Sequence, residues 1–208
     1  KEESFRRHCN RAGNAVGISA NDKIFNEILR NFGGHLRLVI MGAAPCNAEV
    51  VDDFKTFGVK IYLGYGLTEC APLVAGNNDG LCTSDSVGNP LPGIYVKIKD
   101  PDETGAGEIL VKGPNVMHGY YNDPEATAAV FEDGWFRTGD LGTFDEQTNI
   151  VRIKGRLKNV IVTKNGKNIY PEELEYHLNN SPYIAESLVT GVAADSIEGD
   201  LDDIVVQA

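Results

Sequence analysis

Apolar and polar positions occur in blocks through the first part of the chain, and this pattern predicts a βαβ unit. Residues 36–41 (LRLVIM) and 59–63 (VKIYL) are short apolar runs, which is typical of buried strands. Between them, Asn47 suits the N-cap of a helix over residues 48–57, and Gly58 suits its end. Two strands joined through a helix by short connections predict a parallel sheet.

Another periodicity begins at about residue 87, where short alternating segments are separated by Gly- and Pro-rich turns. Such spacing is typical of a small antiparallel sheet or barrel. Further along, Pro171 followed by Glu172 and Glu173 predicts a helix start, because Pro fits the first turn and acidic side chains suit the positive end of the helix dipole. The expected strands are 95–99, 108–112, 149–154, 160–163 and 187–192, and the expected helix covers 171–179.

The two ends of the chain add a helix and a strand. Residues 1–35 have a polar-faced helical pattern, with Asp22 as a suitable N-cap and an end near Gly33. The β-branched run at 204–206 predicts a strand separated from the rest of its sheet, because no turn follows it. Since the sequence also begins at Lys1 rather than at methionine, we expect it to be a fragment of a longer protein.

Composition and charge narrow the functional classes. The 208 residues are 42% hydrophobic and 24% charged, which is typical of a globular protein. Thirty acidic residues against 19 basic ones give a net charge of −11, which disfavours binding to nucleic acid and to anionic lipid. The four cysteines and four histidines are scattered, which favours reduced thiols and predicts no zinc site. With neither a membrane-length apolar run nor a signal peptide, a cytoplasmic protein is expected.

Two loops that follow predicted strands have unusual compositions, at the position where open α/β sheets bind ligands. Residues 42–45 (GAAP) have only small side chains, so that either a flat ring could approach the backbone or a helix could pack tightly. Residues 64–69 (GYGLTE) combine an aromatic face, a hydroxyl and a carboxylate, which suit a stacked base, a phosphate oxygen and a divalent cation. The alternative for this loop is a Gly-rich turn with Thr68 as a helix cap.

Asp140 is a third candidate, because an ionised carboxylate accepts hydrogen bonds and suits the two vicinal hydroxyls of a ribose. The preceding Trp135 and Phe136 are more typical of a core than of a ligand contact. Arg156 and Lys158 lie beside an expected joint between domains, although a Gly-Arg turn is also an ordinary solvated feature. No single motif identifies a function.

The order and combination of six motifs carry more information. Together they resemble the adenylate-forming superfamily of acyl-CoA synthetases, luciferases and peptide-synthetase adenylation domains. Within it, the sequence is most similar to bacterial long-chain fatty acyl-CoA synthetases, and the resemblance extends from about Gly33 to the end of the chain. The motifs are 42–45 (GAAP), 65–69 (YGLTE), 119–127 (GYYNDPEAT), 135–141 (WFRTGDL), 155–159 (GRLKN) and 165–175 (NGKNIYPEELE).

The resemblance implies a two-step reaction with ATP, a carboxylic acid and coenzyme A as substrates. ATP and the acid give an acyl-adenylate and pyrophosphate, and coenzyme A then attacks to give the thioester and AMP. Charge stabilisation by Mg²⁺ and hydrogen-bond donors should dominate the first step. Coenzyme A brings its own thiol, which agrees with the lack of a Ser/His/Asp or Cys/His arrangement, and Cys70 is interpreted as a buried small side chain.

The resemblance also implies where the nucleotide binds. Gly42, Ala43 and Ala44 would line the adenine and acyl pocket, while Tyr65, next to Gly66, would stack on the adenine. These five residues come from the two loops that follow the predicted parallel strands.

Four further residues are implied at the phosphate, metal and ribose. Thr68 would bind the α-phosphate, and Glu69 would help to hold magnesium. Asp140 would accept hydrogen bonds from the ribose hydroxyls, with Arg156 close to the ribose and phosphate. Thr68, Glu69 and Arg156 are therefore the expected catalytic residues.

Lys158 corresponds to the family's hinge, about which a small C-terminal domain swings between the two half-reactions, and Gly166 falls in a loop brought toward the pantetheine tunnel. The family's phosphate loop and its catalytic lysine near the extreme C-terminus have no counterpart in the sequence, and neither Lys164 nor Lys167 can take the lysine's role. The fragment alone is therefore expected to be inactive.

An α/β fold in three parts follows from these patterns and motifs. Residues 1–86 are expected to be the α/β part of the large domain, 87–154 its β-rich, barrel-like subdomain, and 155–208 the hinge and the start of the small domain. Two alternatives stay open: a ligase for a short, aromatic or amino acid, and a non-catalytic nucleotide-binding or interaction module. Oligomeric state and peripheral attachment to the inner face of the membrane are also left open.

Overall fold

The structure is a computed structural model that describes residues 29–43, 46–56, 58–80, 84–163 and 168–191, together with the strand at 204–207. Within it, a helical turn ends where Gly33 N donates to Arg30 O and Gly34 N donates to Leu29 O, at 3.0 and 2.8 Å. This agrees with the predicted helix end near Gly33. The rest of that helix, with its predicted cap Asp22, lies outside the described residues.

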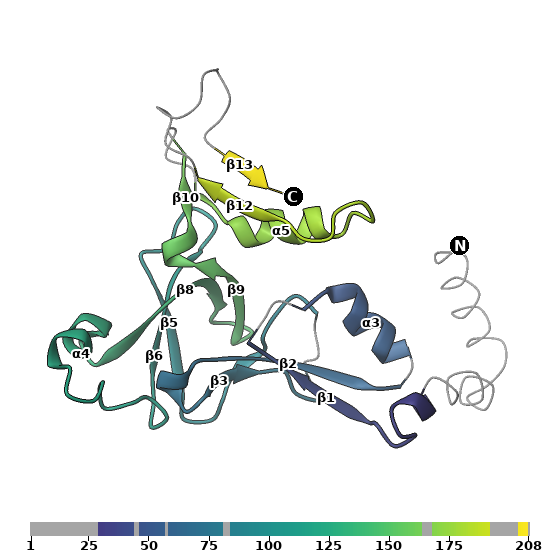
Figure 1. The fold of residues 1–208 in the computed structure, drawn as a ribbon. Coiled ribbons are helices and arrows are strands. Elements are labelled where there is room, and N and C mark those ends of the chain that lie inside the picture. Colours follow the sequence, from purple (N-terminus) through teal and green to yellow (C-terminus); the bar gives the residue numbers. More distant parts are fainter. Residues whose placement is uncertain are drawn as a thin grey trace, which may run out of the picture.

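The predicted βαβ unit is present. Strand β1 (Leu38–Met41), helix α3 (Ala48–Thr56) and strand β2 (Lys60–Gly66) follow one another, and β1 pairs with β2 in parallel. Asn47 caps α3 as predicted, since its Oδ1 accepts from Glu49 N at 2.8 Å. Val51 of α3 is wholly buried, and the helix covers one face of β1 and β2 (Figure 1).

Two antiparallel strands extend this sheet beyond the prediction. β3 (Leu73–Gly76) pairs with β2, and β4 (Asn89–Pro90) pairs with β3, which gives the order β1-β2-β3-β4. Tyr65 is therefore a strand residue, and the prediction that residues 64–66 belong to a loop was wrong. The sheet continues because Gly64 and Tyr65 find pairing partners in Gly76 and Ala75.

The predicted antiparallel sheet follows. Its strands are β5 (Tyr95–Lys99), β6 (Gly107–Lys112), β7 (Phe131–Glu132), β8 (Trp135–Asp145) and β9 (Ile150–Arg156), in the order β5-β6-β8-β7 with β9 also paired to β8. Helix α4 (Pro124–Val130), capped by Asp123, was not predicted. Buried side chains of both sheets, with Cys70 from the turn between β2 and β3, form one core, whose members are Tyr65, Cys70, Val74, Ala75, Val96, Ile109, Val111, Phe136 and Val151.

A smaller C-terminal unit lies above the two sheets in Figure 1. It follows the 3-10 turn η2 (Leu157–Asn159) and contains the pair β10 (Ile161–Val162) and β11 (Asn168–Ile169), helix α5 (Pro171–Asn179), and strands β12 (Leu188–Gly191) and β13 (Ile204–Gln207). α5 has the predicted bounds. The predicted strand at 204–206 is present as β13, which pairs antiparallel with β12 in a sheet of these two strands.

Polar contacts connect the C-terminal unit to the start of α3 and to the second sheet. Asn47 Nδ2 lies 3.3 Å from Asn180 Oδ1, and the Tyr170 hydroxyl donates to Asp102 Oδ2 at 3.2 Å. Lys154 of β9 and Glu173 of α5 form an ion pair at 2.6 Å. Within the described part of the chain, none of the helices is long and apolar enough to cross a membrane.

Candidate functional site

Three of the predicted site residues meet in one cluster. The Tyr65 hydroxyl donates to Asp140 Oδ2 at 2.6 Å, and Arg156 Nε lies 2.9 Å from Asp140 Oδ1. Asp140 and Arg156 face each other as a cross-strand pair of β8 and β9. The Asp140 side chain is 9% exposed and that of Arg156 is 57% exposed, so the guanidinium has a face toward solvent while the carboxylate is enclosed.

Asp140 is presented by an irregular segment of β8. Gly139 has φ 71°, in the left-handed region that glycine adopts without strain, and the pairing of β6 with β8 shifts register here. Gly139 N donates to Glu108 Oε1 at 3.3 Å, and Asp140 N donates to Thr138 Oγ1 at 3.0 Å. The buried Glu108 also accepts from Arg137 through Nε, at 3.0 Å, with Nη2 at 2.9 Å. These contacts replace the interrupted strand pairing and fix the backbone of Asp140.

Sequence reasoning did not identify Glu108, whose position in an almost fully buried strand was the available signal. A carboxylate on such a strand is rarely buried without a charged partner, and Arg137 provides it here. The hydrogen bonds and charge of Glu108 raise the pKa of Arg137 above its ordinary value.

Burial sets the electrostatics of the cluster. Withdrawal from water raises the pKa of Asp140, although the Tyr65 hydroxyl and the charge of Arg156 act in the opposite direction, and the nearby charge of Glu69 raises it further. Burial and the adjoining carboxylate likewise raise the pKa of Tyr65, so its hydroxyl stays a hydrogen-bond donor. The ionised form of the buried Asp140 carboxylate would therefore be stabilised by additional hydrogen-bond donors.

Thr68 and Glu69 lie in the turn η1 (Thr68–Cys70) that follows β2. Thr68 is exposed, and the residue at the N-cap is Leu67, so the alternative role of Thr68 as a cap does not apply. Glu69 is half-buried, and its Oε1 accepts a 2.9 Å hydrogen bond from the Tyr120 hydroxyl. Tyr120 is a contact that sequence reasoning missed, although it lies in the 119–127 motif.

The end of β1 lies beside the end of β2. A Cβ atom at Gly42 would come 3.0 Å from the carbonyl oxygen of Gly64, so close packing of the backbone is one reason for a small residue there. Ala43 is exposed and has φ 67°, which is unusual for a residue with a side chain. Ala44 and Pro45 lie outside the described residues.

Close packing of the backbone explains why residue 66 is a glycine. A Cβ atom at this position would lie 1.8 Å from the carbonyl oxygen of Pro72, because the chain folds back on itself between β2 and β3. Its glycine is thus required by the backbone whether or not a nucleotide binds nearby.

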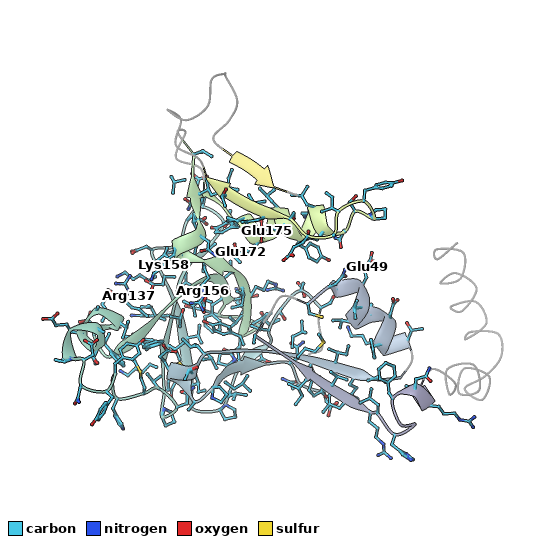
Figure 2. The ribbon with its side chains drawn as sticks, in the orientation of Figure 1. Glu49, Arg137, Arg156, Lys158, Glu172 and Glu175 are labelled. Atoms are coloured by element: carbon cyan, nitrogen blue, oxygen red, sulfur yellow. The ribbon has the colours of Figure 1, made fainter. Side chains whose placement is uncertain are left out.

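Residues 155–159, which contain the predicted hinge residue Lys158, run from the end of β9 into the C-terminal unit. Figure 2 shows Arg156 and Lys158 near the upper end of the second sheet, with Glu172 of α5 above them. Lys158 is exposed in η2, and Asn159 Nδ2 donates to Glu172 Oε1 at 2.8 Å. Gly166 lies outside the described residues.

Glu69 is suited to a magnesium ion that arrives with a nucleotide. Among the described residues, no group of three or more His, Cys, Asp or Glu side chains could enclose a metal ion, and the nearby Asp140 is engaged by Tyr65 and Arg156. Mg²⁺ commonly keeps several waters and takes one or two carboxylates together with substrate phosphates. A single half-exposed carboxylate beside a hydroxyl fits that mode of binding.

Cys70, next to Glu69, is wholly buried as expected. Burial, with the charge of Glu69, raises the pKa of its thiol to about 12. A thiol in this state is a poor nucleophile, because reactivity requires the thiolate.

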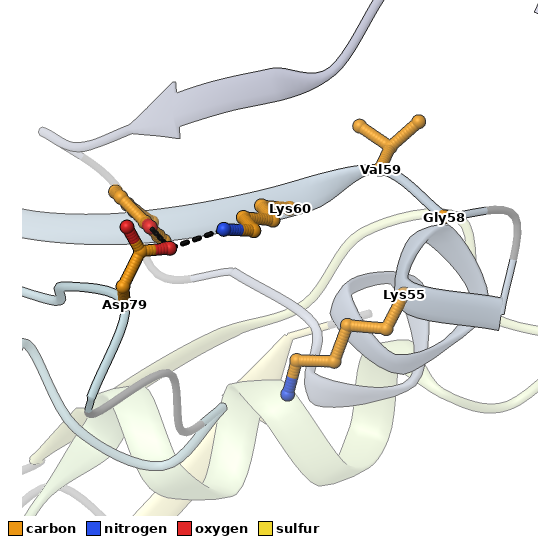
Figure 3. Close-up of a pocket in the computed structure, with 6 residues that line it drawn as sticks. Lys55, Gly58, Val59, Lys60 and Asp79 are labelled. Carbon is orange, nitrogen blue, oxygen red and sulfur yellow. Dashed lines mark hydrogen bonds and ion pairs between the residues drawn. The ribbon is translucent and has the colours of Figure 1, made fainter.

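A groove of about 400 Å³ lies elsewhere, between α3 and the start of β2 (Figure 3). Lys60 forms an ion pair with Asp79, whose Oδ1 also accepts from the Tyr62 hydroxyl at 2.6 Å. The groove is lined by Lys55, Gly58, Val59, Lys60, Tyr62 and Asp79. It includes none of the predicted site residues.

Comparison with known proteins adds to this geometry. The family of AMP-binding enzymes matches residues 8–121. The long-chain-fatty-acid–CoA ligase FadD15 of Mycobacterium bovis is 37% identical over 190 residues, which cover 89% of this chain and 31% of that protein.

Solved structures are also similar. ATP-bound MatB from Rhodopseudomonas palustris gives a TM-score of 0.71 with 37% identity, over 85% of this chain and 35% of that one. O-succinylbenzoate coenzyme A synthetase (MenE) from Bacillus subtilis, in complex with ATP and magnesium ion, gives a TM-score of 0.69 with 31% identity, over 82% of this chain and 36% of that one. The chain thus spans about a third of the length of these relatives.

Proposed function

Because this chain belongs to the family of AMP-binding enzymes, we propose that the protein containing it is an ATP-dependent ligase that activates a fatty acid as an acyl-adenylate and transfers it to coenzyme A. Similarity to a long-chain-fatty-acid–CoA ligase supports the choice of acid. We place this reaction in the cytoplasm, where its substrates ATP and coenzyme A are available.

The observation that carries the proposal is the cluster of Tyr65, Asp140 and Arg156. A carboxylate held in place by a hydroxyl and a guanidinium is pre-organised to accept two hydrogen bonds from vicinal hydroxyls. We assign the ribose hydroxyls of ATP to Asp140. The exposed face of Arg156 would then lie close to the ribose and the α-phosphate.

The remaining groups of the nucleotide are assigned to the ends of β1 and β2. The ring of Tyr65, next to Gly66, would contact the adenine. Gly42, Ala43 and Ala44 would line the adenine and acyl pocket. These assignments rest on the resemblance and on the packing of Gly42 against Gly64.

In the first half-reaction, an oxygen of the substrate carboxylate bonds to the α-phosphorus of ATP, and the bond from that phosphorus to the pyrophosphate oxygen breaks. The Thr68 hydroxyl would donate to the α-phosphate, where negative charge is redistributed. Glu69 would bind Mg²⁺, which supplies charge neutralisation at the phosphates when present. Arg156 adds a fixed positive charge at the same place.

In the second half-reaction, the thiol of coenzyme A gives up its proton to solvent, its sulfur bonds to the acyl carbonyl carbon, and AMP leaves with the electrons of the acyl–phosphate bond. We assign the hinge to Lys158 and the approach to the pantetheine to the loop that contains Gly166. Residues 1–86 and 87–154 would then belong to the large domain and 155–208 to the small one.

A second candidate is a ligase for a shorter or aromatic acid. The similarity to O-succinylbenzoate coenzyme A synthetase favours it, because that relative is named for an aromatic acid. The two candidates share the nucleotide site and differ in the acyl pocket.

Acid-dependent exchange of pyrophosphate into ATP tests the proposal, using the full-length protein and acids from acetate to palmitate. Exchange that rises with acyl length and is lost in Asp140→Ala protein is expected, and the 208-residue chain alone should show none. Exchange only with aromatic or short acids would favour the second candidate. Folded full-length protein without exchange on any acid would contradict a ligase.

A further inference from the structure

The motif at 119–127 (GYYNDPEAT) has no role in the reaction as described so far, yet its contacts lead to Glu69. The segment before it, which connects β6 to α4, lies along the turn η1. Met117 N donates to Glu69 O at 2.8 Å, and Asn115 Nδ2 donates to Cys70 O and Leu73 O at 2.9 and 3.1 Å. The backbone of the turn that carries Glu69 is therefore fixed by this segment.

The same segment also reaches the side chain of Glu69. The Tyr120 hydroxyl donates to Glu69 Oε1 at 2.9 Å, and the Tyr120 side chain comes from the far end of the segment, close to α4. Tyr120 is 38% exposed, whereas the neighbouring Tyr121 is 94% exposed. Of the two adjacent tyrosines, Tyr120 is therefore the one that contacts Glu69, the candidate magnesium ligand.

The other residues of the motif hold Tyr120 in place. Tyr120 N donates to Thr127 Oγ1 at 2.9 Å, and Thr127 Oγ1 donates to Asp123 O at 2.7 Å. Asp123 caps α4 through Ala126 N, at 2.9 Å. A Cβ atom at Gly119 would lie 2.8 Å from Thr127 Cγ2, so a larger residue would push the tyrosine backbone from α4. The contacts at the start of α4 thus fix the backbone position of Tyr120, whose hydroxyl binds Glu69.

We propose that Tyr120 is a positioning residue that orients the Glu69 carboxylate toward the magnesium ion accompanying ATP, an inference that rests on the function proposed above. The hydrogen bond occupies Oε1 and leaves Oε2 for the cation or one of its waters. It also holds the half-exposed Glu69 side chain in one rotamer. Without this bond, the entropy cost of ordering that side chain would be paid when the metal binds. The motif thereby acts on the metal and phosphates without touching the nucleotide.

The test compares Tyr120→Phe with Tyr121→Phe in the full-length protein, in the absence of any acid substrate. Calorimetric titrations with MgATP and with metal-free AMP separate the metal-dependent part of binding from the rest. We expect Tyr120→Phe to weaken MgATP binding about tenfold, near the lower limit for loss of a hydrogen bond to a charged group. AMP binding should stay unchanged, as should both affinities in Tyr121→Phe. Manganese(II) with ATP, followed by electron paramagnetic resonance, gives a second readout of the metal.

A double variant separates positioning from a general effect on the fold. In a Glu69→Gln background, Tyr120→Phe should cause no further loss of MgATP affinity. An equal loss of MgATP and AMP affinity, or no difference between Tyr120→Phe and Tyr121→Phe, would overturn the inference while leaving the ligase intact. Wild-type protein that binds neither nucleotide would instead contradict the proposed function itself.

Discussion

The hydroxyl of Tyr65 donates a 2.6 Å hydrogen bond to Oδ2 of Asp140, across 75 residues of the chain. Tyr65 belongs to the first sheet and Asp140 to the second, so one bond joins the two sheets at the candidate ribose site. The two residues are only 8% and 7% exposed. A buried hydroxyl and a buried carboxylate each need a hydrogen-bond partner, and this one bond satisfies both groups. Packing of the sheets and assembly of the site are therefore coupled.

Removing that hydroxyl should affect stability and binding together. We expect Tyr65→Phe to lower the free energy of unfolding by about 1–3 kcal/mol, because Asp140 loses a donor in a buried place. AMP affinity should fall about tenfold as the carboxylate loses its fixed orientation. Chemical denaturation and calorimetry on the full-length protein measure the two effects.

Tyr62→Phe is the matched control for this variant. Tyr62 is in the same strand and its hydroxyl also donates to an aspartate at 2.6 Å, but Asp79 is 76% exposed in the groove of Figure 3. Water can replace the lost partner there, so neither the unfolding midpoint nor AMP affinity should change measurably. Equal effects of the two substitutions would show that burial is not what makes Tyr65 important.

The raised pKa of Asp140 predicts a pH dependence of stability. Because the folded-state value lies above the ordinary 3.8, the folded protein binds more protons than the unfolded one between the two values. This contribution to stability is full below about pH 3.8 and is lost as pH rises through the folded-state pKa. The difference in unfolding midpoint between Asp140→Asn and wild type should therefore shift in favour of the variant as pH rises toward neutrality.

Asp145→Asn gives the opposite sign. The Thr148 hydroxyl and neighbouring backbone N–H groups lower the pKa of Asp145, so its ionised form stabilises the fold above pH 3.8 and this is lost on acidification through the lowered pKa. The variant should therefore lose stability relative to wild type as pH rises toward 3.8. Denaturation at several pH values measures both series, and a pH-independent difference for Asp140→Asn would contradict the first.

Gly66→Ala should disrupt the fold for a purely steric reason. Its Cβ would lie 1.8 Å from the Pro72 carbonyl oxygen and 2.8 Å from Leu73 Cα, and both are backbone atoms that cannot rotate away. A loss of about 1–3 kcal/mol or more is expected for such overpacking. Gly76→Ala in the paired strand β3 meets nothing within 4 Å and should be tolerated. Soluble yield and thermal melting distinguish them, and a stable Gly66→Ala protein would contradict the close approach.

Local patterns predicted the elements whose signals lie within a few residues. Asn47 and Pro171 mark helix starts through their own backbone chemistry, and residues 95–99 alternate because one face of that strand is buried. Among the missed elements, strand β3 depends on pairing with a distant segment. β3 is four residues long and exists because β2 continues past Tyr65. The strand at β13 was predicted, but its partner β12 lies across residues 192–203, so no local signal identified the pairing.

The site shows the same division. The resemblance drawn from six motifs is confirmed by the family match over residues 8–121 together with the similarity to long-chain-fatty-acid–CoA ligases over most of the chain. The structure brings Tyr65, Asp140 and Arg156 together, while the roles assigned to them stay predictions. Glu108 and Tyr120 were missed because their hydrogen-bond partners are distant in the sequence, and no local sequence pattern indicates which residue such a carboxylate or hydroxyl will contact.

Gly155 and Glu172 provide a test of how α5 is held against β9, next to the predicted hinge. A Cβ atom at Gly155 would lie 2.6 Å from Glu172 Oε2, while Glu172 Oε1 accepts from Asn159. Oε2 is buried and has no hydrogen-bond partner among the described residues. The N-terminus of α5 thus rests directly on the glycine that precedes Arg156.

Gly155→Ala should therefore loosen α5 from β9 only modestly, at a cost of about 1 kcal/mol, the lower end for overpacking, because the atom that the new Cβ meets is the end of a flexible side chain that can move aside. Glu172→Ala removes the colliding oxygen, so the double variant should be closer to wild type than Gly155→Ala alone. Amide hydrogen exchange of α5 in the full-length protein measures this, with Gly76→Ala as the control glycine. Because the residues touch, their effects should be non-additive. Simple addition of the two single effects would mean that the contact between Gly155 and Glu172 does not hold α5 against β9.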